Sequence, residues 1–169
     1  PVEIAYFDRG PIDDKELVTG GFWSTYWYGN HIYGTEIIRG LDVLTLEASE
    51  YITANEIAAA GLADYGGVLN PQQQLPAAWP ENPVVALALL DQLARTGAAD
   101  ASIVKAAKSA MEGARASFDA GESNRRSART IEKLAAKLAS SDDGKSASQL
   151  MLAVAAKLRE PQITSNGAD

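Results

Sequence analysis

FWSTYWYGNHIYGTEIIRGLDVLTL, residues 22–46, decides the fold because it predicts three short β-strands with almost no loop between them. Alternating aromatic and β-branched residues predict strands at 22–28, 31–38 and 41–46. Gly29-Asn30 and Arg39-Gly40 provide the two turns, since glycine tolerates the positive φ that tight turns require. A sheet this small is marginal in water, so we expect it to pack against something else.

The start of the chain has the same strand-like character. The chain begins at Pro1, and residues 2–7 form an apolar segment for which we expect a further strand. A polar stretch containing Gly20-Gly21 separates it from residue 22. A chain that begins inside a strand is expected to be the carboxy-terminal part of a larger protein.

From Ala48 onward the hydrophobic period becomes helical. Thr53 and Glu56 have the spacing of a capping box, which predicts a helix over 54–64. Asn82-Pro83 has the cap-then-proline order of a helix start, and this helix is expected to end at Gly97.

Three further amphipathic helices follow. The pattern predicts one over 101–120, a second capped by Ser123 and ended by Asp142-Asp143-Gly144, and a third over 146–159. Their apolar stripes are rich in alanine. On the 101–120 helix we expect the stripe to comprise Ile103, Ala107, Ala110, Ala114 and Phe118. Short loops between amphipathic helices favour a small antiparallel bundle.

The expected fold class is therefore α+β, in four parts. Residues 1–67 hold the strands and the first helix, and 68–81 form an extended linker interrupted by Pro71, Pro76 and Pro80. Residues 82–160 form the helical bundle, and 161–169 a frayed tail.

Composition excludes several classes of protein. The net charge is −7 and the isoelectric point near 4.7, which argues against nucleic acid as a partner. There is no cysteine, hence no disulfide framework and no thiol nucleophile. No apolar run approaches the ~20 residues that span a bilayer. We expect neither a cofactor nor a metal, because His31 is the sole histidine and has no ligand spacing around it.

Two stretches resemble known families. PVEIAYFDRGPID, residues 1–13, and GGFWSTYWYGNHIYGTEIIRGLDVLTLEASEYITANEIAAA, residues 20–60, resemble the end of a β-propeller built from LVIVD repeats, a family of bacterial and archaeal cell surfaces. ALLDQLARTGAAD and FDAGESNRRSARTIEKLAAKL, residues 88–100 and 118–138, resemble the FIMAH helical domain of secreted bacterial proteins. One departure is the turn Gly29-Asn30, where such repeats more often carry Asn-Gly.

The resemblance implies an incomplete propeller. Residues 1–7 would be the outermost strand of one blade, and 22–46 three strands of the last blade, with its fourth strand supplied from elsewhere. The expected partner is the remainder of the propeller, in the same parent chain or as an associated fragment. The expected location is extracellular or on the cell surface, where a cell-surface or carbohydrate ligand is a further expected partner.

In that setting the candidate ligand-binding residues are Trp23, Glu36, Arg39 and Asp42. Glu36, Arg39 and Asp42 either line a polar channel or form a cross-strand ion pair, Arg39 with Glu36 or Asp42, that ties the turn. Trp23 and its neighbouring aromatics either stack on sugars or form core between blades. The aromatic set is Trp23, Tyr26, Trp27, Tyr28 and Tyr33.

The sequence thus favours a non-catalytic structural and interaction module that closes a propeller and mediates attachment or assembly. The alternative is part of a propeller enzyme or carbohydrate-binding protein, to which Trp23, Glu36 and Asp42 contribute an aromatic and acidic rim. A third possibility is a free-standing α+β domain in which the 54–64 helix covers the sheet.

Overall fold

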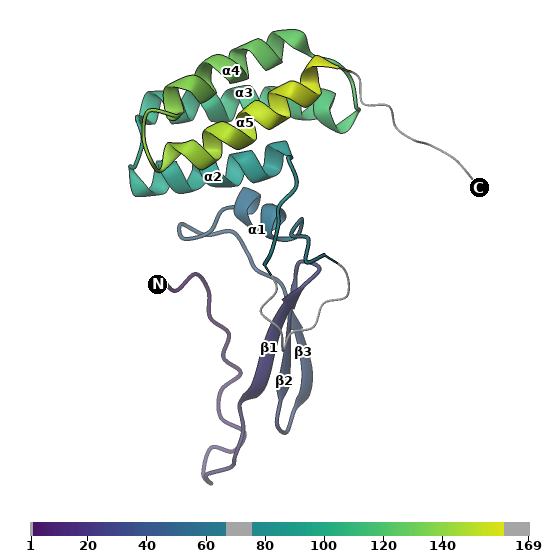
Figure 1. Ribbon diagram of the computed structural model, residues 1–169. Coiled ribbons are helices and arrows are strands. Elements are labelled where there is room, and N and C mark those ends of the chain that lie inside the picture. Colours follow the sequence, from purple (N-terminus) through teal and green to yellow (C-terminus); the bar gives the residue numbers. More distant parts are fainter. Residues whose placement is uncertain (1, 67–75, 161–169) are drawn as a thin grey trace, which may run out of the picture. The chain divides into compact units, whose positions relative to one another are not determined.

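The computed structural model describes residues 2–66 and 76–160 (Figure 1). Three strands and five helices lie in these residues, which confirms the mixed α+β class. The chain divides into two units, residues 1–78 and 79–169. The strands and the first helix belong to the first unit, and the other four helices belong to the second.

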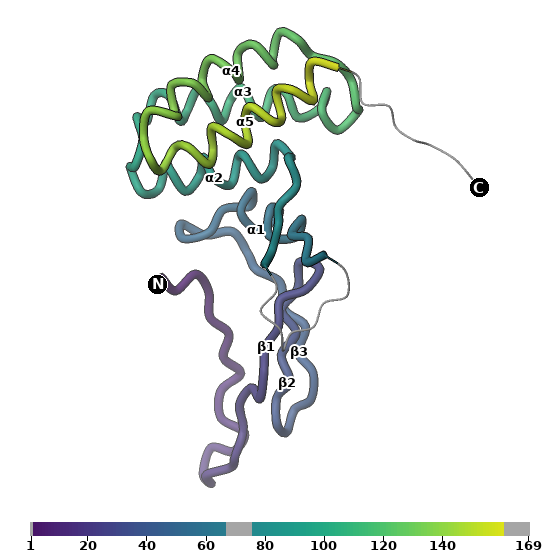
Figure 2. The backbone as a smooth tube through the Cα atoms, viewed as in Figure 1, coloured from purple at the N-terminus to yellow at the C-terminus, as the bar shows by residue number. Residues whose placement is uncertain are grey.

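The three strands form one antiparallel sheet in the order β1-β2-β3, with β2 in the middle (Figure 2). They span Phe22–Tyr28, His31–Glu36 and Gly40–Leu44. At the first turn Gly29 and Asn30 have φ of 55° and 67°, the positive values of a type I′ hairpin, whose twist matches that of the strands. The prediction from residues 22–46 is confirmed in number and order.

The expected strand over residues 2–7 is wrong, since none of these residues pairs with a strand. The segment instead contacts β1 through side chains, with the rings of Phe7 and Phe22 centred 6.4 Å apart. An alternating apolar segment becomes a strand only where a neighbouring strand accepts its backbone hydrogen bonds. In the described part of the chain the outer edges of β1 and β3 both remain unpaired.

Helix α1 spans Ala54–Ala60. The predicted capping box is confirmed, because Thr53 accepts the backbone N–H of Glu56 and Glu56 accepts that of Thr53. The helix ends earlier than the expected residue 64. The backbone N–H and C=O of Asp64 are hydrogen-bonded to Ala78, at 2.7 and 2.9 Å, so they cannot continue a helix. No helix packs on a strand among the described residues, so α1 does not cover the sheet.

The second unit contains four helices: α2 Pro83–Thr96, α3 Ala101–Asp119, α4 Arg125–Leu138 and α5 Gly144–Arg159. Asn82 caps α2 as predicted, and Gly97 ends it with φ of 67°. The cap of α4 is Asn124, not Ser123. The chain is non-helical over residues 139–143, which include Asp142 and Asp143 as predicted, whereas Gly144 already belongs to α5. A Cβ at Gly144 would collide with the Leu138 carbonyl.

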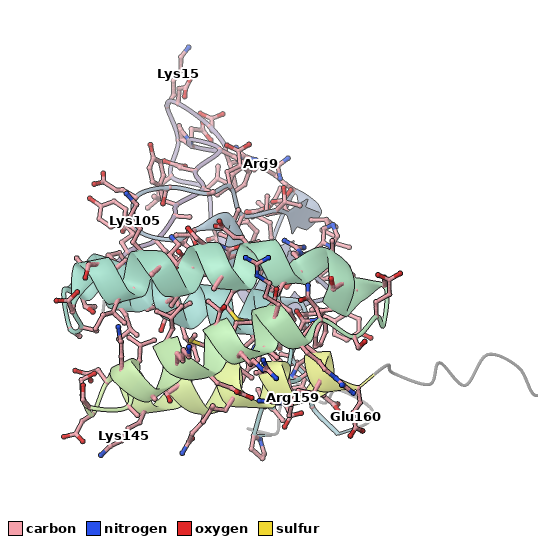
Figure 3. All side chains as sticks on the ribbon, turned by 90° about the horizontal axis from the view of Figure 1, so that it is seen from above. Arg9, Lys15, Lys105, Lys145, Arg159 and Glu160 are labelled. Atoms are coloured by element: carbon pink, nitrogen blue, oxygen red, sulfur yellow. The ribbon has the colours of Figure 1, made fainter. Side chains whose placement is uncertain are left out.

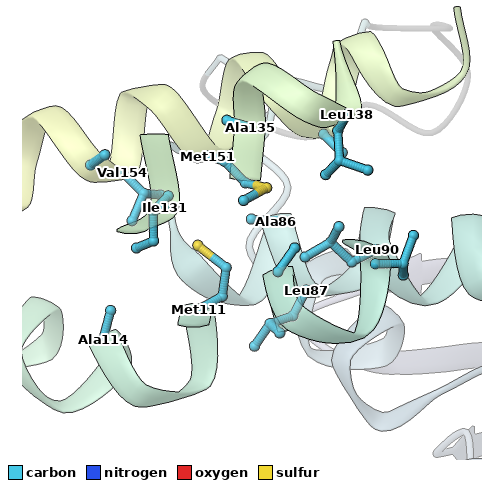
Figure 4. Packing of buried hydrophobic residues seen from close by; sticks show 14 of the residues in the cluster. Ala86, Leu87, Leu90, Met111, Ala114, Ile131, Ala135, Leu138, Met151 and Val154 are labelled. Atoms are coloured by element: carbon cyan, nitrogen blue, oxygen red, sulfur yellow. The ribbon is translucent and has the colours of Figure 1, made fainter. Parts of the chain in front are cut away.

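These helices surround a single apolar core (Figure 4). Helix α4 packs against α5 and α3, and α2 packs against α3 and α5. On α3 the expected stripe is confirmed in part: Ala107 and Ala114 are fully buried. Val104 and Met111 complete the buried side, whereas Ile103, Ala110 and Phe118 are only partly buried. Alanines at the helix contacts are fully buried, which allows the backbones to approach closely. They are Ala86, Ala107, Ala114, Ala128, Ala135 and Ala155.

Candidate functional site

Glu36, at the end of β2, holds the β2–β3 turn together. Its side chain is buried, and its carboxylate accepts the backbone N–H groups of Gly21 at 2.7 Å, Ile38 at 2.8 Å and Arg39. These hydrogen bonds, that of Arg39 foremost, hold the pKa of the Glu36 carboxyl below its ordinary value of 4.5. A carboxylate with this many backbone donors stays ionised. The interaction also explains why β2 ends at residue 36, short of the predicted 38.

Arg39 does not form a side-chain ion pair with Glu36 or Asp42, which was one of the two alternatives left open by the sequence. Its guanidinium donates to the backbone carbonyls of Gly10 at 3.3 Å and Pro11 at 2.8 Å. The link between Arg39 and Glu36 runs through the Arg39 backbone N–H. Arg39 therefore fastens the segment that precedes β1 to the β2–β3 turn.

Asp42, on β3, pairs with Arg9. The Arg9 guanidinium donates to both Asp42 carboxylate oxygens, at 2.9 and 3.0 Å. Only 15% of the Asp42 side chain is exposed, so this pair is partly shielded from water. No local pattern around Asp42 identifies Arg9, because the two residues are 33 positions apart.

Glu36 and Arg39 line a shallow cavity of about 290 Å³. The rest of the wall comes from residues 7–12 and from residues 18 and 20–22. A Cβ at Gly20 would meet the end of the Ile12 side chain, which would then have to move. The charged groups at this cavity are already hydrogen-bonded within the chain, so they provide little free capacity for a ligand.

Trp23 lies apart from this cavity. It occupies a β-bulge, where the pairing of β1 with β2 shifts between Phe22 and Ser24. Its side chain is 81% exposed, an unusual state for the largest apolar side chain. The structure therefore does not combine Trp23 with Glu36 and Asp42 into one rim.

The remaining aromatic residues divide between the two faces of the sheet. The register places Trp27 on the same face as Ile32, and Tyr26 on the opposite face with Tyr33 and Val43. On this second face Val43 is 52% exposed. This face of the sheet is therefore an apolar surface that its own unit does not cover fully.

His31 has a structural role. Its Nδ1 donates to the Gly29 carbonyl at 2.8 Å, and its ring lies 6.2 Å from that of Tyr33. No group of three or more His, Asp or Glu side chains suited to a metal ion is found among residues 2–66 and 76–160. In the same residues no helix is long and apolar enough to cross a membrane.

Searches against protein-family models, curated proteins and solved structures each found no match.

Proposed function

We propose that this chain is a non-catalytic structural and interaction module of a secreted or cell-surface propeller protein. In this proposal the strands complete a propeller blade, and the second unit, a small helical bundle, mediates attachment or assembly. The partner of the sheet is the remainder of the propeller, in the same parent chain or as an associated fragment.

The observation that carries the proposal is the unequal burial in the two units. Of the apolar residues that are buried in the described parts of the chain, Ala59 alone belongs to the sheet unit. Tyr6 is 87% and Leu41 62% exposed, and several further large apolar side chains of that unit lie open to solvent. A water-exposed apolar surface of this kind is typical of a protein interface. The sheet unit therefore needs another surface to supply its core.

The sheet edges support the same conclusion. Neither β1 nor β3 has an outer neighbour within residues 2–66 and 76–160, and unpaired strand edges invite pairing with another strand. A four-stranded blade needs one more strand, which an edge of this sheet can accept. The resemblance of residues 1–60 to LVIVD repeats points to a propeller as the source of that strand.

A structural role also fits the candidate site residues. Glu36 accepts three backbone N–H groups, which fixes the β2–β3 turn and joins it to Gly21. Asp42 binds Arg9, which joins β3 to the segment that precedes β1. A catalytic carboxylate has to reach a substrate proton or carbon instead.

The proposal is tested on particles isolated under native conditions, with the wild-type sequence and with Val43→Lys. Size exclusion with light scattering measures the mass of each particle, and intact mass spectrometry identifies its components. We expect the wild-type sequence to be part of a particle heavier than the 17.9 kDa of this chain, with propeller strands in its other part. Val43→Lys should weaken that association by about 100-fold or more, because desolvating an unpaired ammonium costs several kcal/mol.

Leu152→Lys is the matched control. Leu152 lies on α5 and is 44% exposed, close to the exposure of Val43, but it belongs to the unit that has its own core. This variant should leave the mass of the particle unchanged. A 17.9 kDa monomer for the wild type, with the same mass for both variants, would contradict the proposed role of the sheet.

A further inference from the structure

Positive charge is concentrated in the last two helices of a chain that is acidic elsewhere. Residues 125–159 contain eight basic and three acidic residues, a net charge of +5, whereas the whole chain carries −7. The rest of the chain therefore carries −12. A separation of this size within one polypeptide is typical of a surface that binds an anionic partner.

Four of the five cations of α4 form a row on its exposed side. Arg126, Arg129, Lys133 and Lys137 are separated by three, four and four positions, which places them within about 80° of one another around the helix axis. All four are exposed, and the opposite side of α4 is buried in the core. The row, hereafter the α4 basic row, extends for roughly 16 Å.

In the described part of the chain, the α4 basic row differs from the other cations of these two helices in having no side-chain partner. None of its four side chains forms an ion pair with any residue in 2–66 or 76–160. By contrast, Arg159 pairs with Glu132 at 2.6 Å and Lys157 with Glu81 at 3.2 Å. Figure 3 shows Lys145 and Arg159 at opposite ends of α5, and Lys145 is paired with Asp142.

The charges of the row disfavour the isolated helix. Arg129, Lys133 and Lys137 are like charges at i,i+4 spacing, which destabilises a helix. Arg126 lies in the first turn, where the helix dipole already presents positive charge. An anion that binds along α4 relieves both effects at once.

We propose that the α4 basic row binds a linear anionic polysaccharide with one carboxylate on each sugar unit. The spacing of the cations along the axis, roughly 4.5–6 Å, suits a polymer with one charge on each ring-sized unit. This inference rests on the proposed attachment role of the helical unit and names the chemistry that it attaches to.

Two other anionic partners fit the row less well. Duplex DNA carries a charge every ~1.7 Å of its axis, far denser than the row, and residues 125–159 contain no aromatic side chain on which single-stranded bases could stack. A helix that lies on a lipid surface inserts an apolar face, but the apolar face of α4 is buried in the core.

The test uses the full chain, with polygalacturonate as the probe and titration calorimetry over a range of salt concentrations. The row variant is Arg129→Gln/Lys133→Gln. The control, Lys105→Gln/Arg115→Gln, removes one lysine and one arginine from α3. We expect about a 30-fold loss of affinity at low salt for the row variant, since one basic side chain at an anionic surface contributes about 5-fold. The control should bind like the wild type.

Three results would overturn the inference. Equal losses in the two double variants would mean that binding follows net charge alone. Tighter binding of a single-stranded oligonucleotide or of anionic lipid vesicles than of polygalacturonate would assign the row to that partner instead. Salt-sensitive self-association lost in the row variant, without polysaccharide binding, would make the acidic part of a second copy the occupant. Self-association through the row would raise the particle mass, but the row variant would abolish it and Val43→Lys would not, so the sheet proposal is tested separately.

Discussion

We expect Leu90→Ala to lower the free energy of unfolding of the helical unit by about 2–5 kcal/mol. Leu90 is fully buried in α2 and contributes to the core shared by the four helices (Figure 4). Removing its side chain loses apolar burial and leaves a cavity that the neighbouring helices cannot close completely. Urea denaturation followed by circular dichroism at 222 nm measures the change, because α2–α5 hold most of the helical residues.

Leu152→Ala is the control for this prediction. Leu152 lies on α5, in the same unit, and is 44% exposed, so its truncation should change the stability by less than about 0.5 kcal/mol. Equal shifts in the two urea midpoints would mean that the four helices do not share the core described above.

The second large effect is expected at the β2–β3 turn. Glu36→Gln should speed the amide exchange of Ile38 and Arg39, because a neutral amide is a weaker acceptor than the carboxylate that binds both N–H groups. Hydrogen exchange followed by NMR on the full chain should show these amides exchanging roughly tenfold faster. Glu47→Gln, an exposed glutamate beyond β3, should leave both rates unchanged.

The lowered pKa of Glu36 adds a pH dependence with a definite sign. Because the folded-state pKa lies below the ordinary value of 4.5, the stabilising contribution of the carboxylate is complete above pH 4.5 and is lost as the pH falls through the lowered folded pKa. Acidification should therefore loosen the wild-type turn but not the Glu36→Gln turn. A wild-type turn whose protection is unchanged on acidification would contradict this account.

The sequence predicts the sheet well because its signals are local. The alternation of aromatic and β-branched residues, together with the glycines at the turns, defines three strands and their order. The Thr53–Glu56 and Asn82-Pro83 patterns define the starts of two helices. The end of β2 is different, since it depends on Glu36 binding the N–H of Gly21, a residue 15 positions earlier. The failed strand at residues 2–7 has the same cause, because strand formation needs a partner that the segment itself does not reveal.

Tertiary contacts also decide the details of the helices. Both Ser123 and Asn124 suit a helix cap, and Asn124 is the residue that caps α4. Two tertiary hydrogen bonds hold it there: its backbone N–H donates to the Leu158 carbonyl at 2.7 Å, and its side-chain amide donates to the Ser117 hydroxyl at 3.1 Å. On α3 the expected and the buried stripes share Ala107 and Ala114, and a rotation of roughly 40° about the helix axis exchanges Ile103 and Ala110 for Val104 and Met111.

The candidate site was predictable only in part. Glu36, Arg39 and Asp42 belong to one hairpin, so their proximity follows from the sequence. Their partners do not, because Arg9 and the Gly10 carbonyl come from a segment without regular secondary structure. The exposure of Trp23 depends on a β-bulge, and no pattern in residues 22–28 predicts this bulge.

The central claim is that the helical unit has its own core, whereas the sheet unit depends on a partner. Hydrogen exchange measured by mass spectrometry on the chain alone tests it most directly. We predict slow exchange for α2–α5, governed by the unfolding of their shared core, and exchange at least 100-fold faster for β1–β3, which lack such a core. Equally slow exchange in strands and helices, in a 17.9 kDa monomer that unfolds in one transition, would contradict the account.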